Sequence, residues 1–193
     1  MRKILIIGCI MILCGILSSC RGYSVKSDSD NNDNEVTVIN ADYPWYKDAH
    51  ELVNCADLVF TGKVTNISYE KLDIRTKEDK EKPTGAVGDM RIPYTIFTVK
   101  IDKILKGKHQ GEFIKINRPG GIFDEQEYIL ENAKEIAKEE NYLFTVSTYE
   151  DSDATLKNPY QASYNLNETK EANSVRDSQN TITLNEILEL FGK

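Results

Sequence analysis

The sequence predicts a mainly β (α+β) domain, built as a small closed or partly open β-barrel of about five strands with a short helix near each end. Three observations lead to this prediction. Several segments alternate apolar and polar residues with the period of a strand, an early strand changes the parity of its inward face near a glycine, and the last residues have helical spacing. We expect the barrel domain to span residues 42–193.

The first nineteen residues have the form of a signal peptide. Met1-Arg2-Lys3 is a short basic start, and the run from Ile4 to Leu17 is apolar and uncharged. As a helix this run would reach only about 21 Å, short of the ~30 Å hydrocarbon core of a membrane. We therefore expect residues 1–19 to be a removable signal rather than a permanent span.

The end of this run, Leu17-Ser18-Ser19-Cys20, resembles the lipobox of bacterial lipoproteins. The resemblance implies cleavage between Ser19 and Cys20, a diacylglyceryl group on the Cys20 thiol, and a lipid anchor in the cell membrane on its extracytoplasmic face. Residues 20–41 are polar and acidic, and we expect them to form a flexible tether. The alternatives are an ordinary secretory signal that contains a cysteine and an uncleaved anchor.

The net charge and the cysteine content limit the classes of function that the sequence is compatible with. The chain has 24 Lys and Arg against 31 Asp and Glu, a formal net charge of −7, which argues against a nucleic-acid partner. Once the signal is removed and Cys20 is modified, Cys55 remains as the single free thiol, so no internal disulfide is expected. We expect Cys55 to be a small buried residue at a helix end. We also expect the protein to be a monomer.

The first helix is predicted over residues 48–55. Asp48 is a suitable N-cap with Glu51 three residues later, and the apolar residues that follow lie on one side. A strand is predicted over 57–69, with a bulge near Gly62 where its apolar parity changes. Residues 72–90 are charged and then punctuated by Gly and Pro, so we expect an exposed loop.

The strongest strand is predicted from Tyr94 to Leu105. One face of it is apolar and should point into the core: Thr95, Phe97, Val99, Ile101 and Leu105. Four shorter strands are predicted near residues 113–116, 127–131, 142–148 and 160–166.

Two further helices are predicted towards the C-terminus. Residues 133–140 have helical composition but few apolar side chains. Thr183 and Glu186 form a capping-box pattern, and they are followed by an apolar stripe of Leu184, Ile187, Leu188 and Phe191. Between these two segments, residues 167–181 are polar and are expected to be mobile.

Parts of this pattern resemble a known family. Ala56-Asp57-Leu58-Val59-Phe60-x-Gly62-Lys63-Val64 resembles the first strand of netrin-like modules, the barrels shared with tissue inhibitors of metalloproteinases. Tyr94-x-x-Phe97-x-Val99-x-Ile101 and the following Lys106-Gly107 resemble the second strand and its turn. The resemblance covers about residues 47–150 and implies a five-stranded OB-type barrel. The chain is also similar to uncharacterised exported lipoproteins of low-GC Gram-positive bacteria.

The inhibitory mechanism of the metalloproteinase inhibitors does not carry over. It uses a free N-terminal cysteine held by disulfides, whereas Cys20 would be lipidated and the disulfide partners are absent. No catalytic group, metal site or cofactor is singled out either. His50 and Cys55 lie about 140° apart around a helix, and His109 belongs to a basic turn.

Two aromatic or apolar groups are candidate binding surfaces. Tyr43, Trp45 and Tyr46 lie where the tether meets the domain, and Ile122 and Phe123 follow a Pro-Gly-Gly sequence on an expected loop. Such rings can stack on a sugar or contact a partner protein. The alternative is that they cover the edge of the barrel and fasten the tether to it.

We therefore expect a lipid-anchored extracytoplasmic binding module without catalytic activity, whose partner is a protein or a cell-wall component. One alternative is an accessory ligand-binding lipoprotein of a transporter or sensor system. Another is a hydrolase that uses a pair of carboxylates.

Overall fold

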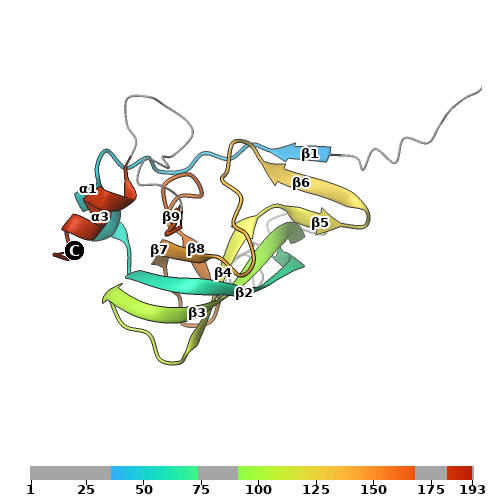
Figure 1. Cartoon of the computed structure of the whole chain (residues 1–193). Helices are drawn as coiled ribbons and strands as arrows, with labels where there is room; N and C mark the ends of the chain where they lie inside the picture. Colours follow the sequence, from blue (N-terminus) through green and yellow to red (C-terminus); the bar gives the residue numbers. More distant parts are fainter. Residues whose placement is uncertain (1–35, 74–90, 168–181, 193) are drawn as a thin grey trace, which may run out of the picture. The chain divides into compact units, whose positions relative to one another are not determined.

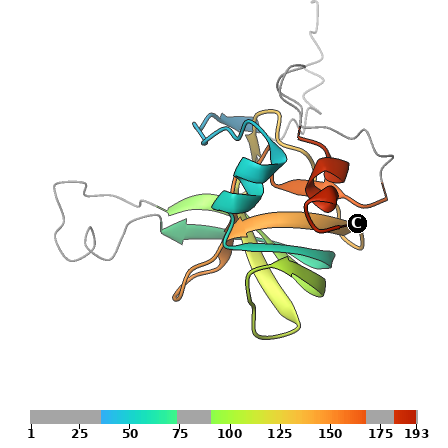
Figure 2. The ribbon, with the colours of Figure 1, turned by 90° about the vertical axis from the view of Figure 1, so that its left-hand side faces the viewer.

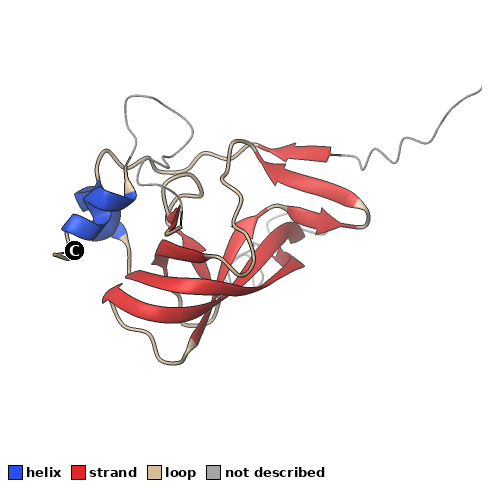
Figure 3. Cartoon of the chain, viewed as in Figure 1, coloured by secondary structure: helices blue, strands red, loops and turns tan. Residues whose placement is uncertain are grey.

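Nine strands and two helices make up the part of the chain that the computed structural model describes, namely residues 36–73, 91–167 and 182–192 (Figures 1 and 3). The prediction of a mainly β protein is confirmed. Several predictions lie outside the described residues: the signal peptide, cleavage and lipidation at Ser19 and Cys20, and most of the loop predicted at 72–90 and of the polar segment predicted at 167–181. The first two residues of that loop, Leu72 and Asp73, belong instead to strand β2, where they pair with β3.

Two long antiparallel strands, β2 (Leu58–Asp73) and β3 (Arg91–Lys106), form the centre of the fold. Their register shifts at three places, one of them between Thr61 and Gly62, so the predicted bulge is confirmed. Glycine is required at position 62 because a Cβ there would lie 2.5 Å from the carbonyl oxygen of Lys100. The bulge turns the apolar side chains of both halves of β2 toward the same core.

The larger sheet closes on itself. Its strand order is β2-β3-β4-β8-β7-β9, and β2 also pairs with β7, so five of its strands form a ring. The other strands of this sheet are β4 (Phe113–Pro119), β7 (Asn141–Ser147), β8 (Ala154–Leu156) and β9 (Ser163–Asn165). Strands β4 and β8 run parallel, and the remaining pairs of the ring are antiparallel.

The predicted inward face of β3 largely matches the observed core. Thr95, Phe97 and Val99 are buried, and Ile101 and Leu105 are partly buried. Ile96 is also buried although it belongs to the opposite face. This part of β3 is therefore covered on both sides.

A second, three-stranded sheet has the order β1-β6-β5 and lies on the opposite side of Figure 1 from the two helices. Its strands are β1 (Val36–Ile39), β6 (Gln126–Leu130) and β5 (Gly121–Phe123). Strand β1 pairs parallel with β6, although these residues were expected to end the tether. The β-branched sequence Val-Thr-Val-Ile suits a strand, and the edge of β6 supplies its hydrogen-bonding partner.

The two helices, α1 (Ala49–Cys55) and α3 (Leu184–Glu189), lie side by side (Figure 2). Both predicted caps are confirmed: Asp48 accepts a hydrogen bond from the Glu51 amide, and Thr183 forms a full capping box with Glu186. Ile187 of α3 is fully buried in a cluster with Leu52 of α1. In the part of the chain described, no helix has the length and apolar character needed to cross a bilayer.

Two sequence predictions are wrong, one between β6 and β7 and one at the end of α1. Residues 133–140 form no helix: Asn132 and Glu139 have positive φ angles, and Ile136 alone in this segment is buried. Cys55 is exposed rather than buried, because the neighbouring Ala56 occupies the inward position at the end of α1.

Candidate functional site

Arg118 occupies an inward-facing position on β4. Ile114, Ile116 and Arg118 share one face of the strand, and Arg118 pairs in register with Thr95 of β3. Its guanidinium carbon lies 5.2 Å from the centroid of the Phe97 ring, a cation–π contact within the domain. A permanently charged side chain therefore stands where a third apolar residue would be expected.

The guanidinium of Arg118 is only partly satisfied. Nη1 donates a 2.6 Å hydrogen bond to the carbonyl oxygen of Lys134. Nε is buried and has no hydrogen-bond partner among the described residues, and no ion pair joins the guanidinium to an acid there. Burial lowers the pKa of Arg118 from its ordinary value, and the nearby Glu135 opposes that shift.

A cavity of about 330 Å³ lies against Arg118, and we call it the inner cavity. Its apolar walls include Phe97, Ile67, Ile122 and Ile136. Glu127 and Glu135 supply two carboxylates to the lining, so the described lining holds two acids and one cation. A volume of this size is at the lower end of the range for small-molecule sites.

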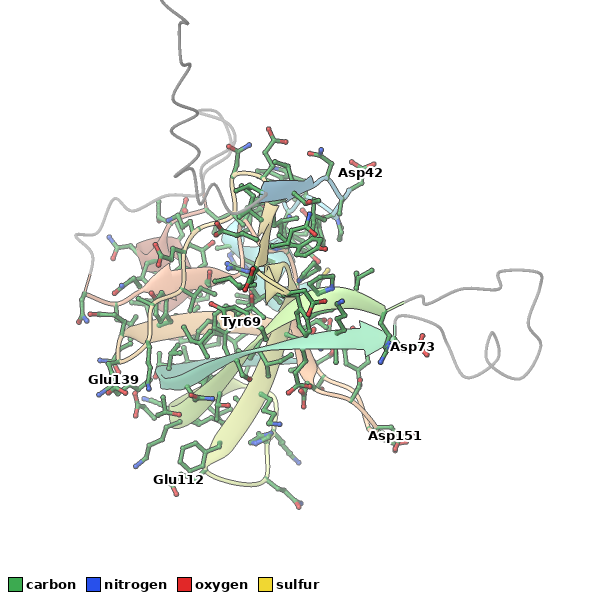
Figure 4. All side chains as sticks on the ribbon, turned by 90° about the vertical axis from the view of Figure 1, so that its right-hand side faces the viewer. Asp42, Tyr69, Asp73, Glu112, Glu139 and Asp151 are labelled. Atoms are coloured by element: carbon green, nitrogen blue, oxygen red, sulfur yellow. The ribbon has the colours of Figure 1, made fainter. Side chains whose placement is uncertain are left out.

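The wall of the inner cavity depends on two glycines that join β4 to β5. Gly121 has φ +140°, and a Cβ there would lie 2.6 Å from Cδ1 of Tyr69. Gly120 has φ +105°, and its carbonyl accepts a 2.9 Å hydrogen bond from Thr95 Oγ1. In Figure 4 Tyr69 lies toward the centre of the view on β2, whereas the labelled acidic side chains lie around its edge.

A second cavity, of about 270 Å³, lies beside the first, and we call it the tyrosine groove. Tyr43, Tyr94 and Tyr149 line it, and Arg118 and Pro119 border both cavities. Beneath it, register partners on β4, β8 and β7 place three polar side chains on one face of the sheet: Asn117, Thr155 and Ser147.

The tyrosine groove also contains an unsatisfied polar atom. Asn117 Oδ1 is buried and accepts no hydrogen bond from any residue that the structure describes. The Tyr149 hydroxyl lies 3.1 Å from Thr155 Oγ1, and Lys157 Nζ donates to Ser147 Oγ at 3.1 Å. Burial raises the pKa of Tyr43 to about 12 and also raises the pKa of Tyr94. Both hydroxyls therefore remain neutral donors and acceptors at ordinary pH.

The structure gives the three aromatic residues of the first predicted surface different surroundings, although Tyr43 and Trp45 both pack against Tyr160. Tyr43 lines the tyrosine groove, with its ring edge-on to Tyr160 at 6.0 Å. Trp45 packs 6.2 Å from Tyr160 and is 36% exposed. Tyr46 is 5% exposed, and Gln161 hydrogen-bonds both its backbone N–H and its C=O. Tyr46 is thus a packing residue, as the alternative interpretation expected.

The second predicted surface is placed on a strand rather than a loop. Ile122 and Phe123 belong to β5, because the chain bends at Gly120 after β4 and then pairs with β6 in a hairpin whose turn is Asp124-Glu125. Ile122 is 47% exposed and lines the inner cavity, whereas the Phe123 ring lies 4.9 Å from the ammonium of Lys71. One residue of each predicted surface, Tyr43 and Ile122, therefore lines a cavity that Arg118 also borders.

Sequence reasoning missed Arg118 itself. The signal was present in the alternation Ile114-Lys115-Ile116-Asn117-Arg118, which puts the arginine on the apolar face. The histidines offer no alternative site. His50 is exposed, and His109 Nε2 lies 2.9 Å from the Phe113 carbonyl. Within residues 36–73, 91–167 and 182–192, no group of three or more His, Cys, Asp or Glu side chains could hold a metal ion.

No protein-family model matches the chain, and no curated protein is significantly similar to it. The lipobox and the netrin-like pattern therefore rest on the residues quoted for them above.

Proposed function

We propose that the protein is a lipid-anchored extracytoplasmic binding module without catalytic activity, and that its tyrosine groove binds a neutral saccharide segment of the cell wall. The observation that carries this proposal is the grouping of three tyrosine rings with the unsatisfied Asn117 oxygen in one cavity of about 270 Å³. Tyrosine rings provide flat apolar surface for a sugar ring, and a buried amide oxygen can accept a bond from a sugar hydroxyl.

The strand order supports an OB-type barrel as part of this proposal. We assign β2, β3, β4, β7 and β8 as its five strands, with β4 and β8 forming the parallel pair. OB-type barrels bind oligosaccharides and oligonucleotides on the face of their second and third strands and in the loops beside it. The tyrosine groove is lined by residues of β3 and β4 and by Tyr149, in the connection from β7 to β8.

Charge favours a saccharide over a nucleic acid. The full chain carries a formal net charge of −7, and basic side chains do not dominate the groove, where Arg118 and Lys157 stand beside three tyrosines. A polyanion would gain little from such a surface. A neutral sugar needs only stacking surface and hydrogen-bonding groups.

The inner cavity favours a second candidate function, the accessory ligand-binding lipoprotein of a transporter or sensor system. A cavity of about 330 Å³ with one partly buried cation suits a small molecule better than a polymer.

The test is a titration of the membrane-extracted lipoprotein, in detergent, with N-acetylglucosamine tetramer as a neutral probe. We expect binding by isothermal calorimetry and a loss of about tenfold or more in Tyr149→Ala, because truncated aromatic anchors often cost 2 kcal/mol or more. Tyr149 is 54% exposed, so its removal leaves the core intact.

Tyr128→Ala is the matched control, because Tyr128 lines the inner cavity and not the groove. It should bind the tetramer like the native protein. Absence of binding by the native protein, or equal affinity of native protein and Tyr149→Ala, would overturn the saccharide proposal.

A further inference from the structure

The free edge of the Arg118 guanidinium has the geometry of a carboxylate receptor. Nη1 is occupied by the Lys134 carbonyl, whereas Nε and Nη2 form no hydrogen bond with any described residue. Nε and Nη2 lie on the same edge of a guanidinium, and two parallel N–H groups on one edge pair with the two oxygens of a carboxylate.

Leaving the buried Nε–H of Arg118 without a partner is costly. A buried polar group without a partner loses its hydration and gains nothing in return, and for a charged group the penalty is larger. The Phe97 ring beneath the guanidinium compensates only in part. A ligand that supplies two acceptor oxygens would remove this penalty, which is a reason for the position to hold arginine rather than a third isoleucine.

We propose that the inner cavity binds a small organic monocarboxylate with an apolar body, whose carboxylate is held by the free edge of Arg118. The apolar walls formed by Phe97, Ile67 and Ile136 would cover the body of the ligand. Nε has almost no exposed surface in the ligand-free chain, so the carboxylate first contacts Nη2 and reaches Nε after a rotation of the Arg118 side chain.

The charge of the cavity selects a monoanion over a dianion. Arg118 is the one cationic side chain in the described lining, and Glu127 and Glu135 also line the cavity. A phosphate dianion would bring two charges to one cation in the presence of two carboxylates, which is unfavourable at short range. A carboxylate brings a single charge to Arg118 and therefore meets less repulsion from the two glutamates than a dianion does.

Binding in the inner cavity does not depend on binding in the tyrosine groove, so it is tested with different probes. We use 3-phenylpropionate as the acid, 3-phenylpropionamide as its neutral isostere and phenyl phosphate as the dianion. The protein is the detergent-extracted lipoprotein labelled with ¹⁵N, and the readout is the arginine Nε–H resonance that disappears in Arg118→Met.

We expect 3-phenylpropionate to shift the Arg118 Nε–H resonance and to bind at least about tenfold more tightly than the amide or the phosphate. Arg118→Lys keeps the charge but loses the paired donors, so it should bind the acid about tenfold or more weakly. Lys115→Met is the matched control, because Lys115 is an exposed cation on the opposite face of β4, and it should bind normally.

Two sources of such a carboxylate are separated by a further pair of probes, acetyl-Ala-Ala-Phe and its C-terminal amide. Tighter binding of the peptide acid than of 3-phenylpropionate assigns the site to a peptide C-terminus, and the reverse assigns it to a free acid. Equal binding of 3-phenylpropionate and its amide, binding of the acid that survives in Arg118→Met, or no shift at millimolar acid overturns the proposal. Tyr149→Ala should bind 3-phenylpropionate normally even if the saccharide proposal fails.

Discussion

Gln161 joins two segments of the chain that are 115 residues apart. Its fully buried side-chain amide accepts a hydrogen bond from the Tyr46 N–H at 2.9 Å and donates one to the Tyr46 carbonyl at 2.8 Å. Asn158 donates a third bond to the carbonyl of Pro44. These bonds fix the residues before α1 against the loop that precedes β9, and so they position Tyr43 in the tyrosine groove.

We therefore predict that Gln161→Ala lowers the free energy of unfolding by about 2–3 kcal/mol, because it leaves two buried backbone groups of Tyr46 unpaired. Urea denaturation followed by circular dichroism measures the change. Gln110→Ala, at an exposed loop position, is the control and should change stability by less than about 0.5 kcal/mol. Equal midpoints for the two variants would show that the Gln161 bonds do not hold this segment.

At the level of single residues, sequence reasoning succeeded where a local rule applies and failed where partners are distant. The caps at Asp48 and Thr183 are local, since each interacts with a residue three positions later. Gln161 is brought to Tyr46 by the tertiary fold, and no periodic pattern in the sequence predicts this contact. Arg118 was visible as a charged residue on an apolar face, but its unpaired edge appears only when the neighbouring strands are in place.

The β5–β6 hairpin carries a strained turn. Asp124 and Glu125 link Phe123 to Gln126, and both have positive φ angles, 50° and 64°. A two-residue hairpin turn with two positive φ angles favours Asn or Asp followed by Gly. This chain has Asp at the first position, where it pairs with Lys71 at 3.2 Å, but Glu at the second.

We predict that Glu125→Gly raises the free energy of unfolding by about 0.5–1 kcal/mol. Glycine removes a left-handed penalty of about 1–2 kcal/mol and adds an entropic cost of about 0.5–1 kcal/mol. Thermal denaturation is the measurement. Glu70→Gly makes the same chemical change in the extended strand β2 and should lower the melting temperature. A lower melting temperature for Glu125→Gly would contradict the turn geometry.

Elements with a strong period or a cap were predictable, and those defined by a partner strand were not. The inward face of β3 could be predicted from the alternation of Thr95, Phe97 and Val99, all of which are buried. Strands β1, β5 and β8 contain only three or four residues, too few for a clear alternation. Strands β1 and β8 are also defined by pairing with a strand distant in sequence, as Val38 pairs with Ile129. The segment 133–140 had helix-forming residues, but it lacks an apolar stripe that could bury a helix.

At the scale of the whole molecule, the sequence predicted a binding module with two candidate surfaces but no cavity for its ligand. The two cavities are the positions at which we propose that ligands bind. Tyr43 and Ile122, one residue from each predicted surface, line the two cavities that Arg118 borders. The sequence showed these residues as separate groups because 79 positions divide Tyr43 from Ile122. No local pattern encodes the contacts that place them: hydrogen bonds from Gln161 and Asn158 fix the segment beside Tyr43, and pairing with β6 fixes Ile122.

The location of the protein decides which ligands it can meet, and the lipid anchor that we propose depends on Cys20. We predict that protein extracted from the membranes of its native host begins at Cys20, has lost residues 1–19, and carries a diacylglyceryl group on that cysteine. A thioether-linked diacylglycerol has two acyl chains, which are enough for stable anchoring. Cys20→Ala, which lacks the acceptor thiol, should accumulate as the full 193-residue precursor without lipid.

Intact mass spectrometry of the membrane-extracted protein is the most direct measurement. A mass equal to residues 20–193 plus a diacylglyceryl group, with the modification assigned to Cys20 by fragmentation, is the result we predict. An unmodified Cys20, or a mature N-terminus at another residue, would contradict the lipid anchor and with it the proposed role of the domain as a binding module held at the outer face of the membrane.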